Sequence, residues 1–247
     1  VDIGGTLAST INIHAYRRLM AHLGYGGEPP IAYLSRRSSS VLPDERLLRR
    51  LDVDCRAVVL GGPDAFPERE RPDGSLLDEW GVTWKRVDEG RHYINAGGPF
   101  SGQEPSSALL EQFRWPNPLD PGRFRTLRSQ AEAHRAASDA ARILVLGVGM
   151  IPQYQFMRGF ADSLEDLLRA PDFVRAFCER YLDFWTCTTR RALEEVGDLV
   201  DLVMFGDDLG AQQAPMMSPA TYRSLFKPSH ATVVAEAAKF GKPMLYH

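Results

Sequence analysis

Short runs of apolar residues alternate with helical segments along most of this 247-residue chain, and this alternation constrains the fold more than any other feature. The runs are apolar at consecutive positions, which is typical of strands that helices cover on both faces of a parallel sheet. The strand-like runs are residues 1–3, 57–60, 143–148, 199–205 and 244–246. The pattern predicts repeated βα units around a parallel sheet.

Helix signals fill the intervals between these runs. Asp120 and Pro121 provide an N-cap and a first-turn proline for a helix that we expect to reach about residue 141. Residues 162–170 and 171–196 are expected to form two further helices, the second of them ended by Gly197. The long helix carries an aromatic stripe, which is typical of a helix face buried in a core.

Five parallel strands are too few for a closed sheet. An open sheet leaves backbone donors and acceptors unpaired at its edges, whereas eight strands close and remove those edges. A complete barrel of this kind takes about 250 residues without insertions. We therefore expect an α/β fold, a (β/α)8 TIM barrel, of which residues 1–247 form an incomplete domain with about five of the eight strands. Because the chain starts inside one run and stops after another, we expect a truncated fragment whose last three strands follow downstream.

Residues 61–105 break this rhythm with many prolines and glycines. We expect an insertion over the barrel mouth, built on a hairpin of residues 79–87 and 91–95 that turns at Asp88-Glu89-Gly90. Its aromatic side chains either line a substrate or pack the hairpin onto the body, and packing is the commoner outcome. These side chains are Trp80, Trp84 and Tyr93.

The composition favours a protein that acts on a small molecule. The net charge of −3 and the pI near 6.1 leave no basic excess that would attract nucleic acid or an anionic membrane surface. No apolar run reaches the roughly 20 residues that span a bilayer. The three cysteines are scattered without a CxxC pair, which suits a reducing compartment. We therefore expect a cytoplasmic protein with a small-molecule substrate, no nucleic-acid partner and no membrane partner.

Two adjacent carboxylates, Asp207 and Asp208, follow the apolar run at 199–205, and the amide of Gln212 follows them. Adjacent residues at the end of a strand point in opposite directions, so one Asp is expected to face the barrel axis while the other forms a cap or hydrogen-bonds loop backbone. Carboxylates at this end of barrel strands bind substrates or move protons. Asp207 and Asp208 are therefore candidate catalytic residues, and Gln212 is a candidate substrate-binding residue.

Three further polar residues flank apolar runs. Asp54 and Arg56 lie immediately before the run at 57–60. They either form a local ion pair at the amino-terminal face of the barrel, which serves stability, or bind a substrate between them. In the second interpretation Asp54 is a candidate catalytic residue and Arg56 a candidate substrate-binding residue. His247 follows the run at 244–246, and a lone histidine there is either structural or a metal ligand.

Five segments follow one another in an order that points to one enzyme superfamily. They are LLRRLDVDCRAV, DEWGVTWKRV, FRWPNPLDPGRF, FMRGFADSLEDLLRAPDF and, most specific, the stretch from Gly197 to His247. In this order they resemble the uroporphyrinogen decarboxylase (URO-D) superfamily, which includes that decarboxylase and cobalamin-dependent methyltransferases that pass a methyl group to a thiol. The resemblance covers nearly the whole chain and implies a (β/α)8 barrel.

The methyltransferase branch of this superfamily implies a metal ligand. In that branch the strand ending at the position of His247 continues into a His-x-Cys motif, a second Cys comes later, and the three residues hold zinc. Zinc would lower the pKa of an acceptor thiol so that it is a thiolate at neutral pH. The resemblance thus implies zinc as a cofactor, with His247 as one ligand and cysteines expected beyond the chain end. It also implies a methylated corrinoid as co-substrate and a corrinoid protein as a candidate partner.

Two departures disfavour uroporphyrinogen decarboxylation itself. The decarboxylase carries an arginine-rich segment near its N-terminus that binds the propionates of the tetrapyrrole, and here VDIGGTLAST occupies the comparable region without an arginine. Burying several carboxylates without cations is costly. The tyrosine expected after the third strand is matched only approximately, by Tyr154 with Gln155 beside it, and Tyr154 is a candidate substrate-binding residue.

The leading hypothesis is a zinc-dependent methyltransferase that acts on a corrinoid and a thiol-type acceptor, with His247 as a ligand and Asp207 or Asp208 positioning substrate. The second is a metal-free decarboxylase in which a carboxylate such as Asp54 or Asp207 stabilises positive charge on a pyrrole-like ring. The third is a barrel that only binds a corrinoid or tetrapyrrole. The fold alone does not separate these functions.

Overall fold

The centre of the molecule is a parallel sheet. The computed structural model describes residues 1–27, 31–87 and 92–247, and within them this sheet has four strands in the order β11-β10-β9-β4. The strands are β4 (Cys55–Val59), β9 (Ala141–Val148), β10 (Leu202–Gly206) and β11 (Met244–Tyr246). Each pair of neighbours is parallel and consecutive among these strands in the chain. The protein is therefore mixed α/β, and the sheet formed by the described residues is open.

Four of the five predicted strands are confirmed, and the first is wrong. Residues 1–3 begin beside β4, because the Asp54 N–H donates to the Val1 carbonyl at 2.9 Å. Gly4 then adopts a φ of +83°, and its N–H donates to the Ser9 carbonyl at 2.8 Å. Glycine tolerates this left-handed conformation. The chain therefore turns away before a ladder with β4 forms.

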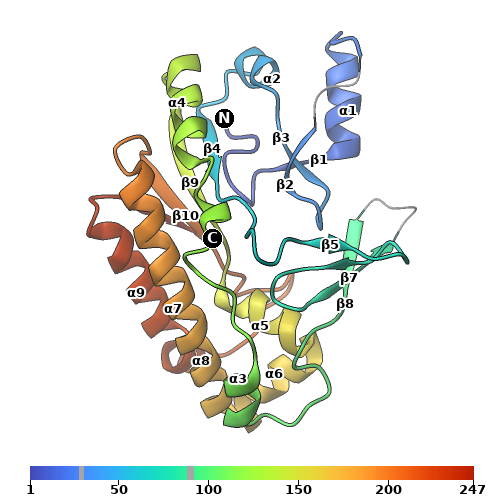
Figure 1. The fold of residues 1–247 in the computed structure, drawn as a ribbon, viewed down its shortest axis with the longest axis vertical. Helices are drawn as coiled ribbons and strands as arrows, with labels where there is room; N and C mark the ends of the chain where they lie inside the picture. The colour runs from blue at the N-terminus through green and yellow to red at the C-terminus, as the bar shows by residue number, and fades with distance from the viewer. Residues whose placement is uncertain (28–30, 88–91) are drawn as a thin grey trace.

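Helices connect the strands of this sheet and cover one of its sides. These are α4 (Leu127–Ala137), α7 (Pro171–Val196) and α9 (Lys227–Ala238), and α7 contacts both of the others (Figure 1). Helix α7 has the predicted bounds, and the N–H of Gly197 still donates to the Leu193 carbonyl at 2.8 Å. Its predicted aromatic stripe is buried in the main hydrophobic core, which confirms that expectation. The stripe consists of Phe173, Phe177 and Phe184.

The predicted helix from Asp120 to about residue 141 is wrong in part. Asp120 accepts the Gly122 N–H at 3.0 Å and caps only a short 3-10 turn, η2 (Pro121–Arg123). The same carboxylate accepts two backbone N–H groups of the loop after β4, at 2.8 and 3.1 Å. These bonds lower the pKa of Asp120 and tie the turn to that loop. The α-helix begins only at Leu127, and residue 141 already belongs to β9.

Two small antiparallel sheets accompany the parallel one. The first has the order β1 (Ile11–Asn12), β3 (Ser40–Leu42) and β2 (Ala32–Ser35), with α1 (Ile13–His22) and α2 (Glu45–Arg50) following its strands in the chain. The second has the order β5 (Arg69–Glu70), β6 (Leu76–Leu77), β7 (Thr83–Val87) and β8 (His92–Gly97). Strands β7 and β8 pair antiparallel, which confirms the predicted hairpin. Its predicted turn at Asp88-Glu89-Gly90, with Arg91, lies outside the described residues.

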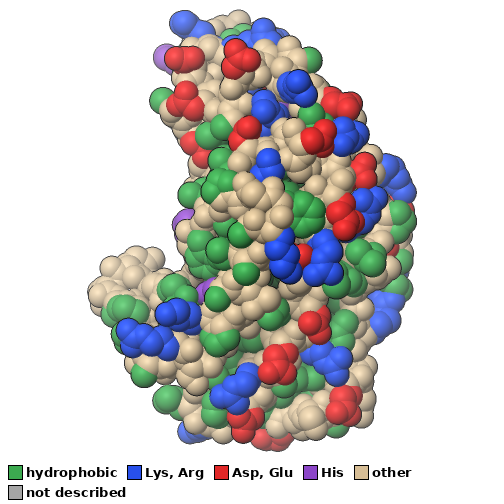
Figure 2. Space-filling view, turned by 90° about the vertical axis from the view of Figure 1, so that its left-hand side faces the viewer, with side chains coloured by type: hydrophobic (Ala, Val, Ile, Leu, Met, Phe, Trp, Pro, Cys, Tyr) green, Lys and Arg blue, Asp and Glu red, His purple; other side chains and the backbone are tan. Residues whose placement is uncertain are grey.

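The remaining helices lie on the carboxyl side of the parallel strands or in the loops. They are α3 (Ser107–Gln112), α5 (Met150–Arg158), α6 (Phe160–Arg169) and α8 (Pro219–Leu225). On the side of α4, α7 and α9, charged side chains of both signs are interspersed with apolar ones (Figure 2). In the described part of the chain, none of the helices combines the length and the apolar character that a membrane span needs.

Candidate functional site

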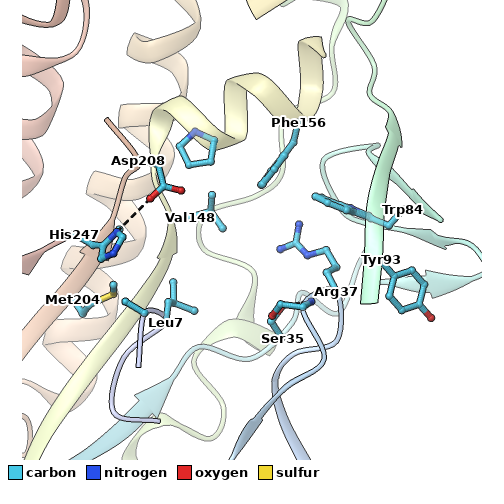
Figure 3. A pocket seen from close by; sticks show the side chains of 14 residues that line it. Leu7, Ser35, Arg37, Trp84, Tyr93, Val148, Phe156, Met204, Asp208 and His247 are labelled. Atoms are coloured by element: carbon cyan, nitrogen blue, oxygen red, sulfur yellow. Dashed lines mark hydrogen bonds and ion pairs between the residues drawn. The ribbon is translucent and has the colours of Figure 1, made fainter. Parts of the chain in front are cut away.

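The carboxyl ends of β10 and β11 bring Asp208 and His247 together. Phe205 pairs with Tyr246 in the ladder. The Asp207 N–H donates to the His247 carbonyl at 3.1 Å, so the segments that follow β10 and β11 stay paired just beyond the strands. The carboxylate of Asp208 lies 3.3 Å from Nδ1 of His247 (Figure 3). Their side chains are 61% and 54% exposed. A ligand can therefore reach both groups.

Asp207 turns the other way and is buried. Its two oxygens accept the N–H groups of Met150 and Ile151, at 2.9 and 3.0 Å, and cap the N-terminus of α5. Nε2 of His230 lies 2.8 Å from this carboxylate, and the Tyr246 hydroxyl lies 3.4 Å from it. Burial and the nearby Asp207 raise the pKa of Tyr246. The expectation that one of the two adjacent carboxylates forms a cap or binds loop backbone is confirmed, because Asp207 caps α5.

Gly149 allows this cap to form. A Cβ atom at Gly149 would lie 2.3 Å from the Gly206 carbonyl oxygen and 2.4 Å from Cγ of Asp207. Cβ atoms do not approach other heavy atoms so closely, so any larger residue would push β10 and α5 apart. The close approach of these two elements is what buries Asp207 and leaves Asp208 on the open side.

Asp208 and His247 form one wall of a cavity of about 390 Å³. Figure 3 shows Arg37, Trp84 and Phe156 across from this pair. Much of the remaining lining is apolar and includes Leu7, Val148, Pro152 and Met204. A mostly apolar cavity with a few convergent polar groups is the usual form of a small-molecule site.

Asp78 holds the far wall of the cavity in place. Its Oδ2 accepts the Trp84 indole N–H at 2.9 Å and a guanidinium N–H of Arg37 at 3.2 Å. The Arg37 guanidinium also lies over the Trp84 ring, 4.8 Å from its centroid. Trp84 in turn packs edge-on against Phe156, with ring centroids 4.8 Å apart. Trp84 therefore lines the cavity and packs the hairpin at the same time.

Asp54 and Arg56 lie at the amino end of the sheet, away from this cavity. Asp54 contacts the amino group of Val1. Arg56 is only 2% exposed; its guanidinium pairs with Glu45 at 2.8 Å and donates to two backbone carbonyls. Their position at the amino end of the sheet agrees with the interpretation that they lie on the face that serves stability. The expected ion pair between Asp54 and Arg56 is corrected, because Glu45 on α2 takes the place of Asp54.

Tyr154 and Gln212 are also outside the cavity lining. Tyr154 is 2% exposed, and its hydroxyl donates to Asp166 at 2.5 Å, where Nε of Arg158 also donates at 2.7 Å. Tyr154 thus belongs to a buried cluster of α5 and α6 rather than to a substrate contact. Gln212 is exposed on the loop between β10 and α8. Its amide follows the strand end in sequence, but the loop carries it away from the cavity.

The sequence patterns did not indicate Arg37 or Phe156 as site residues. Arg37 reaches the cavity from the turn between β2 and β3. The polar run SRRSSS around Arg37 is the one signal in the sequence. Of the three hairpin aromatics, Trp84 and Tyr93 line this cavity, and Trp80 and Trp84 both belong to the main hydrophobic core.

The chemistry available at this site is that of a carboxylate and an imidazole in contact. Such a pair orients a ligand or transfers a proton. Among the residues that the structure describes, no group of three or more His, Cys, Asp or Glu side chains is placed to hold a metal ion. No protein-family model matches the chain, and no curated protein matches it.

Proposed function

We propose that the chain contributes a URO-D-like (β/α)8 barrel in an enzyme that moves a methyl group between a corrinoid and a thiol-type acceptor. The observation that carries the proposal is the Asp208–His247 pair, 3.3 Å apart, at the carboxyl ends of adjacent parallel strands and on a cavity wall. Active sites of barrel enzymes lie at that face. The sheet order, in which consecutive strands are neighbours, is the order that such a barrel requires.

His247 fits one position of a zinc site. Its Nδ1 faces the Asp208 carboxylate, which leaves Nε2 for a metal, and metal-bound histidines commonly use their other ring nitrogen to contact a carboxylate. The described residues supply no complete ligand set, so His247 is the one ligand that we assign. Bound zinc would lower the pKa of an acceptor thiol and hold it as a thiolate.

Apolar residues of this chain surround the place where the proposed transfer would occur. A methylated corrinoid would supply the methyl carbon to the acceptor thiolate, and the electron pair of the cobalt–carbon bond would stay on cobalt as the sulfur–carbon bond forms. Trp84, Phe156 and Val148 line the cavity with apolar surface, and excluding water there would leave the thiolate less solvated and more reactive. Asp208 would hold the His247 ring in one orientation.

Neither carboxylate that the decarboxylase alternative requires, Asp54 or Asp207, is accessible from the cavity. Asp54 lies at the amino end of the sheet. Asp207 is fully buried, and its oxygens are engaged by α5 and His230. Asp208 is the carboxylate that remains accessible from the cavity.

Methyl transfer from methylcobalamin to 2-mercaptoethanol tests the proposal. The rate is followed by the loss of methylcobalamin absorbance without oxygen, with and without added zinc. We expect zinc-dependent transfer, and His247→Ala should lower its rate by about 100-fold or more, beyond the 10- to 100-fold typical of residues that only orient a ligand. His22→Ala, at an exposed position on α1, is the matched control and should keep the rate.

Three results would contradict the proposal in different ways. An unchanged rate in His247→Ala would remove the ligand role. Carbon dioxide release from uroporphyrinogen without metal would replace methyl transfer by decarboxylation. A spectral shift of cobalamin on binding, without transfer to any thiol, would leave a barrel that binds a corrinoid and does no chemistry.

A further inference from the structure

A second cavity adjoins the first at the carboxyl ends of β4 and β9. Its volume is about 450 Å³. The two cavities share Leu7, Ser35, Arg37 and Val148 in their walls, so Arg37 stands at their boundary. A molecule that reaches Asp208 in the first cavity can therefore extend past Arg37 into the second.

Gln153 on α5 lines this second cavity and has an unsatisfied amide. The residue is 2% exposed, and its Nε2 has no hydrogen-bond partner among the described residues. Buried side-chain donors are nearly always hydrogen-bonded, so one without a partner needs an explanation. Gln153 lines the cavity, and rotation of its terminal amide, whose nitrogen and oxygen can exchange places, would turn this donor toward an acceptor atom of a ligand.

The charged side chains that line the second cavity with Gln153 are largely paired with one another. Arg123 pairs with Glu79, with one contact at 2.9 Å, and Arg36 lies 3.5 Å from Glu68. Burial raises the pKa of Glu68, and the nearby guanidinium groups of Arg37 and Arg36 oppose that shift. Arg37 is bound to Asp78 through one terminal nitrogen, and a guanidinium presents five N–H donors in all. Arg37 therefore keeps donors for a further acceptor.

The geometry points to a carboxylate-binding compartment: the second cavity takes the carboxylate of a small-molecule ligand between Gln153 and Arg37, while the apolar body of that ligand lies against Trp84 and Phe156. A carboxylate accepts from both an amide and a guanidinium, and charge-assisted bonds of this kind are short and strong. The inference rests on the proposed function only in taking the first cavity as the place of reaction. It adds a substrate class, an apolar carboxylic acid, to that site.

Binding of 3-phenylpropanoate to the 247-residue chain, measured by calorimetry, tests this compartment. The probe has an aromatic body and one carboxylate, and 3-phenylpropanol has the same body without the charge. We expect the acid to bind at least about 10-fold more tightly than the alcohol, and Gln153→Leu to weaken the acid by about 10-fold or more, as loss of a hydrogen bond to a charged group does. Arg37→Met should weaken the acid similarly, and neither variant should change binding of the alcohol.

Gln155→Leu is the matched control, because Gln155 lies on the same helix and its amide contacts the sulfur of Met216 at 3.7 Å instead of lining the cavity. It should bind the acid like the wild type, and the urea unfolding midpoints of all variants verify that they fold.

Three results would each overturn the inference. The acid and the alcohol bind equally tightly, the variants Gln153→Leu and Gln155→Leu bind the acid equally tightly, or the acid does not bind. Because the assay needs neither metal nor corrinoid, acid binding without methyl transfer would contradict the proposed function alone. Methyl transfer without selective acid binding would contradict this inference alone.

Discussion

Replacing Asp207 by alanine is expected to lower the free energy of unfolding by about 3–5 kcal/mol, because it removes three hydrogen bonds of a buried carboxylate, and each bond to a charged group contributes about 1.5–3 kcal/mol. The side chain of Asp207 is fully buried and accepts two N–H groups of α5. Its loss leaves those donors and Nε2 of His230 without their acceptor, and buried donors without partners are destabilising. Urea unfolding followed by circular dichroism measures the change.

Asp208→Ala is the matched control for this change, one residue away in the chain. The side chain of Asp208 is 61% exposed and that of its partner, His247, is 54% exposed, and exposed pairs contribute about 0–1 kcal/mol. We expect its unfolding free energy to stay within about 1 kcal/mol of the wild type. Equal destabilisation by the two substitutions would contradict the division of roles between these carboxylates.

Asp166→Ala is expected to destabilise the chain by a similar amount, about 3–5 kcal/mol. Asp166 accepts the Tyr154 hydroxyl at 2.5 Å and Nε of Arg158 at 2.7 Å, and both partners are buried. Removing the carboxylate leaves the Arg158 guanidinium with the carbonyls of Phe100 and Gln103 and with the part-exposed Asp162 carboxylate at 3.4 Å. The same unfolding experiment measures this loss.

Tyr154→Phe is the informative companion to Asp166→Ala. It removes one hydroxyl and should cost about 1 kcal/mol, the net value of a typical hydrogen bond. Because Tyr154 faces Asp166 and not the cavity, binding of 3-phenylpropanoate should not change. A loss of binding with unchanged stability would restore Tyr154 as a substrate contact and contradict the structural role.

Local sequence patterns predict the parts of this fold that local interactions determine. Strands β4, β9, β10 and β11 consist mostly of apolar residues at successive positions, which is typical of strands buried on both faces. Pro171 and Gly197 mark the two ends of α7 because proline suits the first turn of a helix and glycine often ends one. The opposite orientations of Asp207 and Asp208 follow from the alternation of side chains along a strand.

Contacts between distant segments determine the parts that the sequence did not predict. The strands β1, β2 and β3 have two to four residues each, too few for a periodic signal, so the turn that carries Arg37 could not be located. Asp78 accepts hydrogen bonds from Arg37, 41 positions away in the chain, and from Trp84, six positions away. Tyr154 follows a strand as expected, but which face of α5 packs inward depends on α6 and on the core.

The most direct test of the central claim, that Asp208 and His247 form the working wall of the cavity, is the methyl-transfer rate of Asp208→Asn measured beside its unfolding midpoint. Asparagine keeps the size of the side chain but lacks the charge that orients His247. The account predicts a rate about 10- to 100-fold below the wild type, an unchanged midpoint, and wild-type behaviour of the exposed control Asp183→Asn on α7. A wild-type rate in Asp208→Asn would contradict the claim.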